Sequence, residues 1–313
     1  MKIRLIAMTA VVAMFLLAGC GKKTTEVKIA ISNDLLSGPI VVMEELNLIE
    51  RYAPNAKVNA VISGSGTAIN EAFIGNNVDG GILGITTFLV GIDNGIPYKV
   101  ASPVSYSRLS IQTNNLDIKN LRDVSPDDKI ALSSITGTTA MILYIAAEQH
   151  LGRWDALNDQ IVLMNNNDAT IALINNTGIT LAVSDMTNRI KVNEAGCPTV
   201  LDNEDLSLDG SKMSILCVFN EDFHKKNEGT YEAFLTALGD AIKLLNDRDE
   251  QALDILARSV GIDKETIISY MDLGYLRYSM NMDGLDLSVL AGMAFKSGMV
   301  SSEKEIADFV FGK

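Results

Sequence analysis

Short apolar runs alternate with helical patterns along this chain, and this alternation restricts the fold more than any other feature. Strand-like runs lie at residues 27–31, 57–62, 80–85 and 98–104, and helical patterns lie between them at 39–52, 66–74 and 86–92. Connections this short place successive strands parallel to one another in one sheet, with helices on its faces. The sequence therefore predicts an α/β lobe over its first third.

The same alternation restarts after Asn114, with strands expected at 129–133, 160–164 and 180–184 and helices at 139–150 and 169–176. Residues 172–176 (Ala-Leu-Ile-Asn-Asn) also echo residues 72–76 (Ala-Phe-Ile-Gly-Asn). Because the two segments occupy corresponding places in the pattern, they favour two lobes built on one plan.

The last part of the chain is expected to be helical. An apolar strand at 213–219 is followed by helical patterns at 232–245, 250–260, 264–271, 285–295 and 302–311. Such a tail needs a lobe to pack on, and we expect it to return to the first lobe, so that segments near 106–112 and 213–219 cross between the lobes as a hinge. The predicted domains are a first lobe of residues 27–112 with 218–313 and a second lobe of residues 113–217.

Residues 1–19 have the pattern of a bacterial lipoprotein signal peptide. A short basic segment precedes an apolar stretch at 5–17, which is too short to span a bilayer, since a spanning helix needs about 20 residues. The tetrapeptide at 17–20 resembles a lipobox, whose cysteine receives a lipid. We therefore expect export, a lipid on Cys20 that holds the protein at the outer face of the cell membrane or in the periplasm, and a tether over 20–26. An ordinary secretory signal or an uncleaved anchor helix is the alternative.

The net charge argues against polyanionic partners. The formal charge is −13 at pH 7, and removal of Lys2 and Arg4 with the signal peptide makes it −15. A charge of this sign disfavours nucleic acid and anionic lipid surfaces as partners. It does not exclude a small anion in a cleft, because salt screens distant exposed charges over about 8–10 Å.

Cysteine and histidine are too scarce to support a metal site. Cys197 and Cys217 remain beside Cys20, and they form either a disulfide in the exported compartment or two buried thiols. Neither has a C-x-x-C spacing, and His150 and His224 are the only histidines. The chain also lacks a G-x-S-x-G elbow and an H-E-x-x-H motif. We expect no metal, no cofactor and no enzymatic activity.

Three short motifs follow one another along the chain, and their order carries more information than any one of them. Residues 63–68 (Ser-Gly-Ser-Gly-Thr-Ala) open one helix, 135–139 (Ile-Thr-Gly-Thr-Thr) open another, and 219–223 (Phe-Asn-Glu-Asp-Phe) stand where the chain is expected to re-enter the first lobe. Over residues 27–310 this order resembles the nitrate, sulfonate and taurine class of ABC-transporter substrate-binding proteins, which includes thiamine-pyrimidine-precursor binders. The resemblance implies a type II periplasmic-binding-protein fold. The chain departs from many relatives at 184–186, where Ser-Asp-Met replaces an acidic-alanine pair.

The resemblance also implies a function. Such a protein is an extracytoplasmic, monomeric component of an ABC importer that closes its lobes on a small polar or anionic solute and passes it to permease and ATPase subunits. Sulfonates, nitrate, taurine and pyrimidine precursors are the implied solute classes. Two alternatives stay open. One is an enzyme on the same fold that acts on a pyrimidine or menaquinone precursor, and the other is a ligand-sensing partner of a surface receptor.

Two helix openings are candidate ligand sites. Helix N-termini present unpaired N–H groups and a partial positive charge, and small residues let a ligand approach the backbone. One opening per lobe has this composition, and the candidate residues are Ser65, Gly66, Thr67, Thr136, Thr138 and Thr139. Simple helix capping by serine and threonine is the alternative explanation for each of them.

Further candidates follow strands, because open α/β sheets bind ligands at the carboxyl ends of their strands. They are Asn33 with its neighbour Asp34, Ser37, Thr86, Thr87, Ser184 and Asp185. Asp185 is the one that could accept a hydrogen bond from an amine or ring N–H. Turn formation and helix capping explain these residues nearly as well. Arg108 and Arg189 could clamp a sulfonate or carboxylate, although exposed surface arginines are common.

Overall fold

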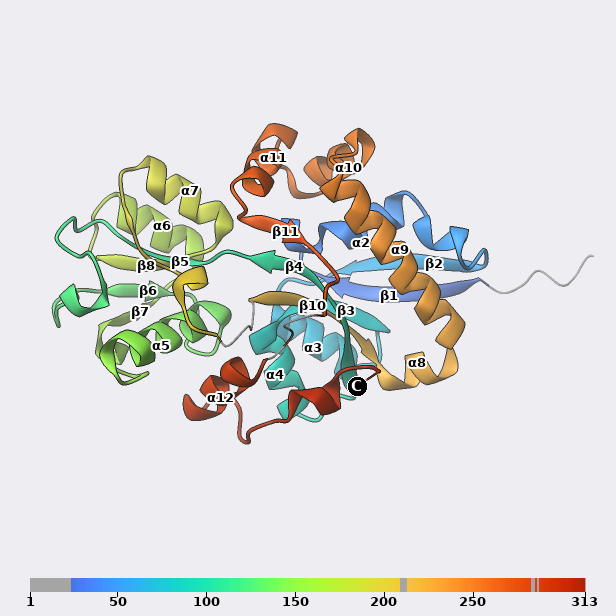
Figure 1. The fold of residues 1–313 in the computed structure, drawn as a ribbon, viewed down its shortest axis with the longest axis horizontal. Coiled ribbons are helices and arrows are strands. Elements are labelled where there is room, and N and C mark those ends of the chain that lie inside the picture. The colour runs from blue at the N-terminus through green and yellow to red at the C-terminus, as the bar shows by residue number, and fades with distance from the viewer. Residues whose placement is uncertain (1–23, 209–212, 283–284, 286, 313) are drawn as a thin grey trace, which may run out of the picture.

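Two separate β-sheets with helices on their faces form the fold (Figure 1). The computed structural model describes residues 24–208, 213–282, 285 and 287–312. The predicted signal peptide, Cys20 and most of the predicted tether therefore lie outside the described residues.

The first sheet has six strands in the order β11-β4-β10-β3-β1-β2. Strands β1 and β2 are parallel, as are β1 and β3, whereas β10 is antiparallel to both β3 and β4. The strands are β1 (Thr25–Ile31), β2 (Ala56–Ile62), β3 (Gly80–Gly84), β4 (Tyr98–Ser107), β10 (Ser214–Asn220) and β11 (Leu276–Tyr278). Helices α2 (Gly38–Glu45), α3 (Gly66–Ile74) and α4 (Ile85–Asp93) follow β1, β2 and β3.

The second sheet has five strands in the order β7-β6-β8-β5-β9. They are β5 (Ser110–Thr113), β6 (Ile130–Leu132), β7 (Ile161–Leu163), β8 (Leu181–Ser184) and β9 (Thr199–Asp202). Helices α5 (Thr138–Leu151), α6 (Asn166–Ile174) and α7 (Met186–Glu194) follow β6, β7 and β8. The expected two-lobed α/β architecture is confirmed.

The chain crosses between the sheets twice, as the expected hinge requires. It leaves the first sheet between β4 and β5, and it returns between β9 and β10 through the 3₁₀ turn η5 (Asn203–Asp205). All of β5 belongs to the second sheet and all of β10 to the first, so the expectation that 213–219 crosses between the lobes is wrong and the return crossing precedes it. Each crossing lies a few residues before the predicted lobe limit. The limits of the lobes themselves stay a prediction.

The C-terminal helices return to the first lobe. They are α8 (Glu221–Lys226), α9 (Glu228–Asn246), α10 (Glu250–Val260), α11 (Lys264–Asp272) and α12 (Ser288–Lys296). Helix α9 packs on α2, and Phe234 of α9 meets Phe219 of β10 edge to face at 4.9 Å between ring centroids. Helix α12 instead contacts α4 of the first lobe and α5 of the second.

Two expectations about secondary structure are wrong. The helix expected at 39–52 ends at Glu45, because Asn47 takes a left-handed conformation (φ 49°), and a 3₁₀ turn follows at Leu48–Arg51. The helix expected at 302–311 is a single 3₁₀ turn at Ile306–Phe309, and strand β11 interrupts the helical tail. The changes in the tail follow from long-range pairing, since β11 adds to β4 and Val310 bridges to Val100.

Apolar side chains connect the lobes. Met186 at the start of α7 belongs to the same buried cluster as Leu35 and Ile31 of the first lobe.

Cys197 and Cys217 are both buried free thiols, which decides between the two alternatives for them. Within the described part of the chain, no helix combines the length and apolar character needed to cross a membrane.

Candidate functional site

The loops that follow strands of the two sheets meet between the lobes. Thr86 in the first turn of α4 and Thr138 at the start of α5 have their hydroxyl oxygens 3.0 Å apart. The N-cap residue of each helix is a glycine, Gly84 before α4 and Gly137 before α5, so no side chain caps either N-terminus. Two helix N-termini, one from each lobe, therefore lie side by side, but the first-lobe partner of α5 is α4, whereas the sequence indicates the helix opening at residues 65–67.

A small cavity between the lobes takes its lining from both of them. Its volume is about 230 Å³. The first lobe contributes residues from the turn after β1 and from the end of α10, and the second lobe contributes the first residues after β8. The lining residues are Asn33, Asp34, Leu35, Leu36, Asp185, Met186, Thr187, Val260 and Ile262. We call this space the interlobe cavity.

Asp185 caps the helix that follows β8. Its carboxylate accepts hydrogen bonds from the backbone N–H of Asn188 at 3.0 Å and from the side-chain amides of Asn166 and Asn188, both at 3.3 Å. The cap explains why an acidic residue suits this position. It also holds the carboxylate at the wall of the interlobe cavity, so capping and ligand contact are compatible.

Asp34 is the corresponding carboxylate of the first lobe. Its Oδ1 accepts a hydrogen bond from the backbone N–H of Ser37 at 3.1 Å. Burial raises the pKa of Asp34, and the negative charge of Asp185 adds to this increase. Because two nearby like charges disfavour the ionised form of each, this arrangement favours a proton or a cation between them.

Gly66 and Thr87 have a packing role. A Cβ on Gly66 would lie 2.3 Å from the Thr87 hydroxyl oxygen, so only glycine lets α3 approach α4 this closely. Ser65 caps α3 by accepting from the backbone N–H of Ala68 at 3.2 Å. Neither these residues nor the exposed Thr67 lines the interlobe cavity.

The other candidates divide between buried and exposed positions. Ser37 and Ser184 are buried and lie close to lining residues in sequence, but they are not part of the lining. Thr139 is buried with no hydrogen-bond partner for its hydroxyl among the described residues. Thr136 is exposed and lies 3.1 Å from the hydroxyl of Ser134. The structure thus brings Asn33, its neighbour Asp34 and Asp185 to one cavity and leaves the other candidates outside its lining.

Sequence patterns did not indicate part of the cavity lining. Val260 and Ile262 come from the end of α10, far along the chain, and apolar residues at a helix end carry no ligand signal. Leu36 and Met186 stand next to residues that were singled out, but their apolar side chains are typical of core positions. Only the return of the tail to the first lobe brings Val260 and Ile262 here.

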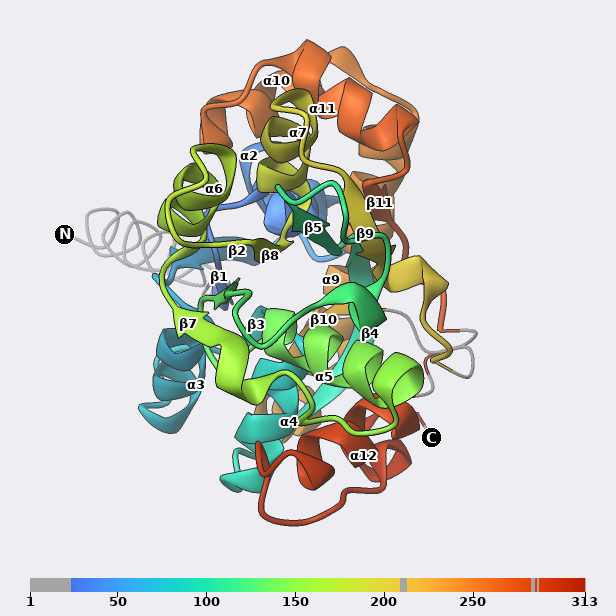
Figure 2. The ribbon, with the colours of Figure 1, turned by 90° about the vertical axis from the view of Figure 1, so that its left-hand side faces the viewer.

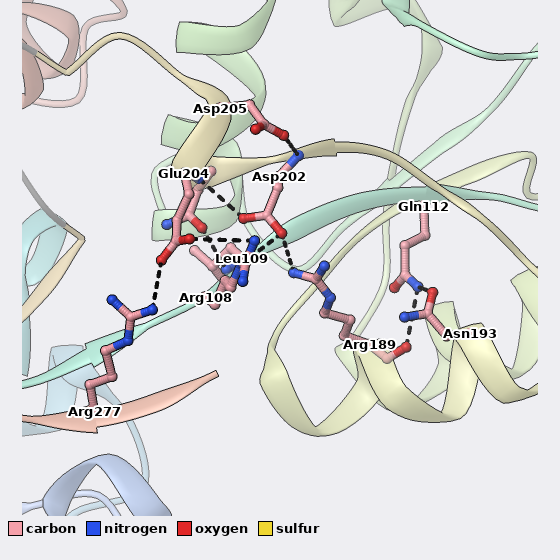
Figure 3. A network of polar contacts seen from close by, with 10 residues as sticks. Arg108, Leu109, Gln112, Arg189, Asn193, Asp202, Glu204, Asp205 and Arg277 are labelled. Atoms are coloured by element: carbon pink, nitrogen blue, oxygen red, sulfur yellow. Dashed lines mark hydrogen bonds and ion pairs between the residues drawn. The ribbon is translucent and has the colours of Figure 1, made fainter. Parts of the chain in front are cut away.

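Arg108 and Arg189 are engaged within the protein (Figure 3). Both guanidinium groups contact Oδ2 of Asp202, at 2.9 Å from Arg108 and 2.5 Å from Arg189. Arg189 is buried and lies over the ring of Tyr275, 4.5 Å from its centroid, which joins α7 of the second lobe to the first lobe. Arg189 is therefore not the exposed surface arginine considered above, and Arg108 is largely covered as well.

Solved structures share this fold. No protein-family model and no curated protein matches the chain. The periplasmic aliphatic sulphonate binding protein SsuA from Escherichia coli superposes with a TM-score of 0.77 at 18% identity, over 92% of each chain. The alkanesulfonate-binding protein SsuA from Xanthomonas axonopodis pv. citri, bound to MOPS, has a TM-score of 0.73 at 12% identity, over 93% of this chain and 99% of that one. A mutant of DszB in complex with biphenyl-2-sulfinic acid has a TM-score of 0.67 at 10% identity, over 92% and 96%.

At identities this low, the similarity establishes the architecture. The chain has the periplasmic-binding-protein fold, with two α/β lobes joined by two crossing segments.

Proposed function

We propose that this protein is the solute-binding component of an ABC importer, held outside the cytoplasm by a lipid on Cys20. The observation that carries the proposal is the interlobe cavity, to which both lobes contribute polar side chains. The similarity to sulfonate-binding transport proteins supports the same role. The loaded protein would pass its solute to the permease and ATPase subunits of the importer.

The cavity provides a mechanism for closure. Asn33 and Asp34 approach a solute from the first lobe, and Asp185 and Thr187 approach it from the second. A solute touches both sets only when the lobes are together, so it binds the closed state more tightly and increases its population. The contact between Thr86 and Thr138 forms in the same arrangement.

The lining favours a solute that carries an amine. Two carboxylates, Asp34 and Asp185, line the cavity, and none of the described lining residues is cationic. A simple anion such as nitrate would meet unfavourable charge there. A compact zwitterion fits better than a simple anion, because its ammonium group can pair with the two carboxylates. Within the implied solute classes, we therefore favour taurine-like aminosulfonates.

A thermal-shift screen tests this proposal directly. The protein without its lipid is heated with nitrate, methanesulfonate, taurine, aromatic carboxylates or pyrimidines. At a hundredfold excess over the dissociation constant, a true solute adds about 2.7 kcal/mol and raises the melting temperature by about 5–10 °C. We expect this increase with an amine-bearing sulfonate and none with nitrate. No shift with any compound, together with chemical turnover of one, would establish the enzyme alternative instead.

A matched pair of variants locates the binding site. Asp185→Asn keeps a good N-cap but removes the charge at the cavity, and at the same solute concentration it should reduce the shift to about half or less. Asp263→Asn makes the same change at the N-cap of α11, where Asp263 accepts from the backbone N–H of Thr266 at 2.8 Å outside the cavity lining, and it should leave the shift intact. Equal shifts in the two variants would place the solute elsewhere.

The anchor and the partners need their own tests. Cys20→Ala should move the protein from the membrane fraction to the soluble fraction of the envelope or the medium. Co-purification of the lipidated protein with a permease, increased by the solute, distinguishes transport from a sensing role. A receptor recovered in place of the permease would support sensing.

A further inference from the structure

A second and larger hollow lies at the crossing segments. Its volume is about 720 Å³, and none of its described lining residues also lines the interlobe cavity. Strand β11 is at one edge of the first sheet and β2 at the other, and Figure 2 shows β11 and β9 on the side opposite to β2 and β7. The hollow is on the β11 side, so we call it the hinge-side hollow.

The hinge-side hollow is rich in guanidinium groups. Arg108 lies on the outgoing crossing segment, Arg277 on β11, and Arg248 just after α9, while Glu204 of the returning segment is the one acidic residue among the described lining residues. On a chain with a net charge of −13, three arginines around one hollow are a marked local excess of positive charge. Arg248 is already paired with Asp272 at 2.7 Å, outside the lining.

Glu204 holds the other two arginines only loosely. Its carboxylate oxygens lie 3.4 Å from Arg108 and 3.8 Å from Arg277 (Figure 3). Charge-assisted hydrogen bonds between these groups are normally about 2.7–2.9 Å long. The side chain of Glu204 is 46% exposed and that of Arg277 is 59% exposed, so water weakens the attraction. An external anion can therefore compete with Glu204.

The remaining lining is partly apolar. Leu206 and Met271 lie on the wall, and Asn246 and Ser279 add polar groups. A hollow of this size and composition suits an organic molecule rather than an inorganic ion, since ligand sites of about 300–1,000 Å³ combine apolar walls with a few polar groups.

We propose that the hinge-side hollow binds a small organic anion whose carboxylate or sulfonate takes the place of Glu204 between Arg108 and Arg277. The apolar body of the ligand lies against Leu206 and Met271. Because Arg108 is on a crossing segment and Arg277 is on β11, the ligand bridges the hinge to the first lobe. A resulting change in solute affinity at the interlobe cavity rests on the proposed function, whereas the anion site itself does not.

Titration calorimetry with naphthalene-2-sulfonate as the probe tests the site on the purified full chain. Arg277→Gln removes one guanidinium and should weaken binding about fivefold. Glu204→Gln removes the competing carboxylate and should strengthen binding about threefold. Opposite changes from two neighbouring residues are a signature that general loss of structure cannot produce, and circular dichroism checks that both variants fold.

Two controls decide where the probe binds. Arg258→Gln removes an exposed arginine that pairs with Glu45 at 3.9 Å outside the hollow, and the affinity should not change. Asp185→Asn alters the interlobe cavity and should also leave the affinity for the probe unchanged. An affinity that rises in Asp185→Asn, because a carboxylate that repels the anionic probe is removed, would assign the probe to the interlobe cavity and overturn the proposal. Binding that is absent, or equal in Arg277→Gln and the unmodified protein, would overturn it as well.

Discussion

Helices α3 and α6 occupy equivalent places in the two lobes and share one local design. Each has nine residues, and they begin one hundred positions apart. Ser65 caps α3 and Asn165 caps α6, each by accepting from the backbone N–H three residues later. Both helices are followed by a left-handed asparagine, Asn76 and Asn176, each with φ 53°. The short sequence echo thus corresponds to a repeated structural unit.

The lobes differ in what stands next to this unit. In the first lobe, Gly66 lets α3 pack closely against Thr87 of α4. Helix α4 itself has no side-chain N-cap. In the second lobe, the equivalent residue is Asn166, whose amide donates to Asp185, the cap of α7. The first lobe therefore uses close backbone packing where the second lobe uses a charged, hydrogen-bonded group.

Gly66→Ala should have the largest effect on stability. The added methyl meets the Thr87 side chain at 2.3 Å, and we expect a loss of about 1–3 kcal/mol in the free energy of unfolding. Asn166→Ala at the equivalent position should cost less, because it removes atoms and adds no clash. Urea unfolding of both variants measures the difference. Equal losses would show that the two lobes are packed alike.

Asp185→Asn should weaken solute binding about tenfold or more, which corresponds to about 1.4 kcal/mol. The charge partner of the solute is lost while the helix cap is kept. Thr86→Val in the first lobe removes only a neutral hydroxyl and should weaken binding less. Calorimetry with the solute found in the screen gives both values. A stronger effect from Thr86→Val would show that Thr86 of the first lobe, and not Asp185 of the second, makes the larger contribution to solute binding.

Asn76→Ala and Asn176→Ala should each cost about 1 kcal/mol, because alanine is poorly suited to the left-handed conformation. The two losses should agree closely if the repeated unit is equivalent in both lobes. Thermal unfolding of the single variants is sufficient. A loss of stability in only one of the two variants would show that the units share their geometry but not their contribution to stability.

Asp34→Asn should have the smallest effect, and its sign depends on pH. The pKa of Asp34 is raised by burial, so its ionised form opposes folding. This group contributes stability that is fully present below its unfolded pKa of about 3.9 and is lost as pH rises through the folded value. The amide of the variant carries no charge, so Asp34→Asn should be slightly more stable than the unmodified protein at pH 7. The advantage should vanish near pH 3 in matched melting curves, and a constant difference would exclude the charge as its cause.

Local signals predicted much of the secondary structure. Helices α3 and α10 begin and end at the expected residues, because each has a capping side chain, Ser65 and Asp249, and the glycines Gly75 and Gly261 at its end. Strand β11 was not expected, because three residues pair with β4 only after α9, α10 and α11 have folded back. The burial of Arg189 was not expected either, since its partners Asp202 and Tyr275 come from other segments of the chain.

The sequence by itself determined the two-lobed α/β plan, the order of its elements and the polar residues that follow the strands. These features depend on periodicity, capping and turn residues, which act over a few positions. Only the tertiary structure decided that Asp34 and Asp185 line one cavity, that Gly66 serves packing, and that a second hollow opens beside the hinge. Those outcomes depend on contacts between residues far apart in the chain, which no local pattern encodes.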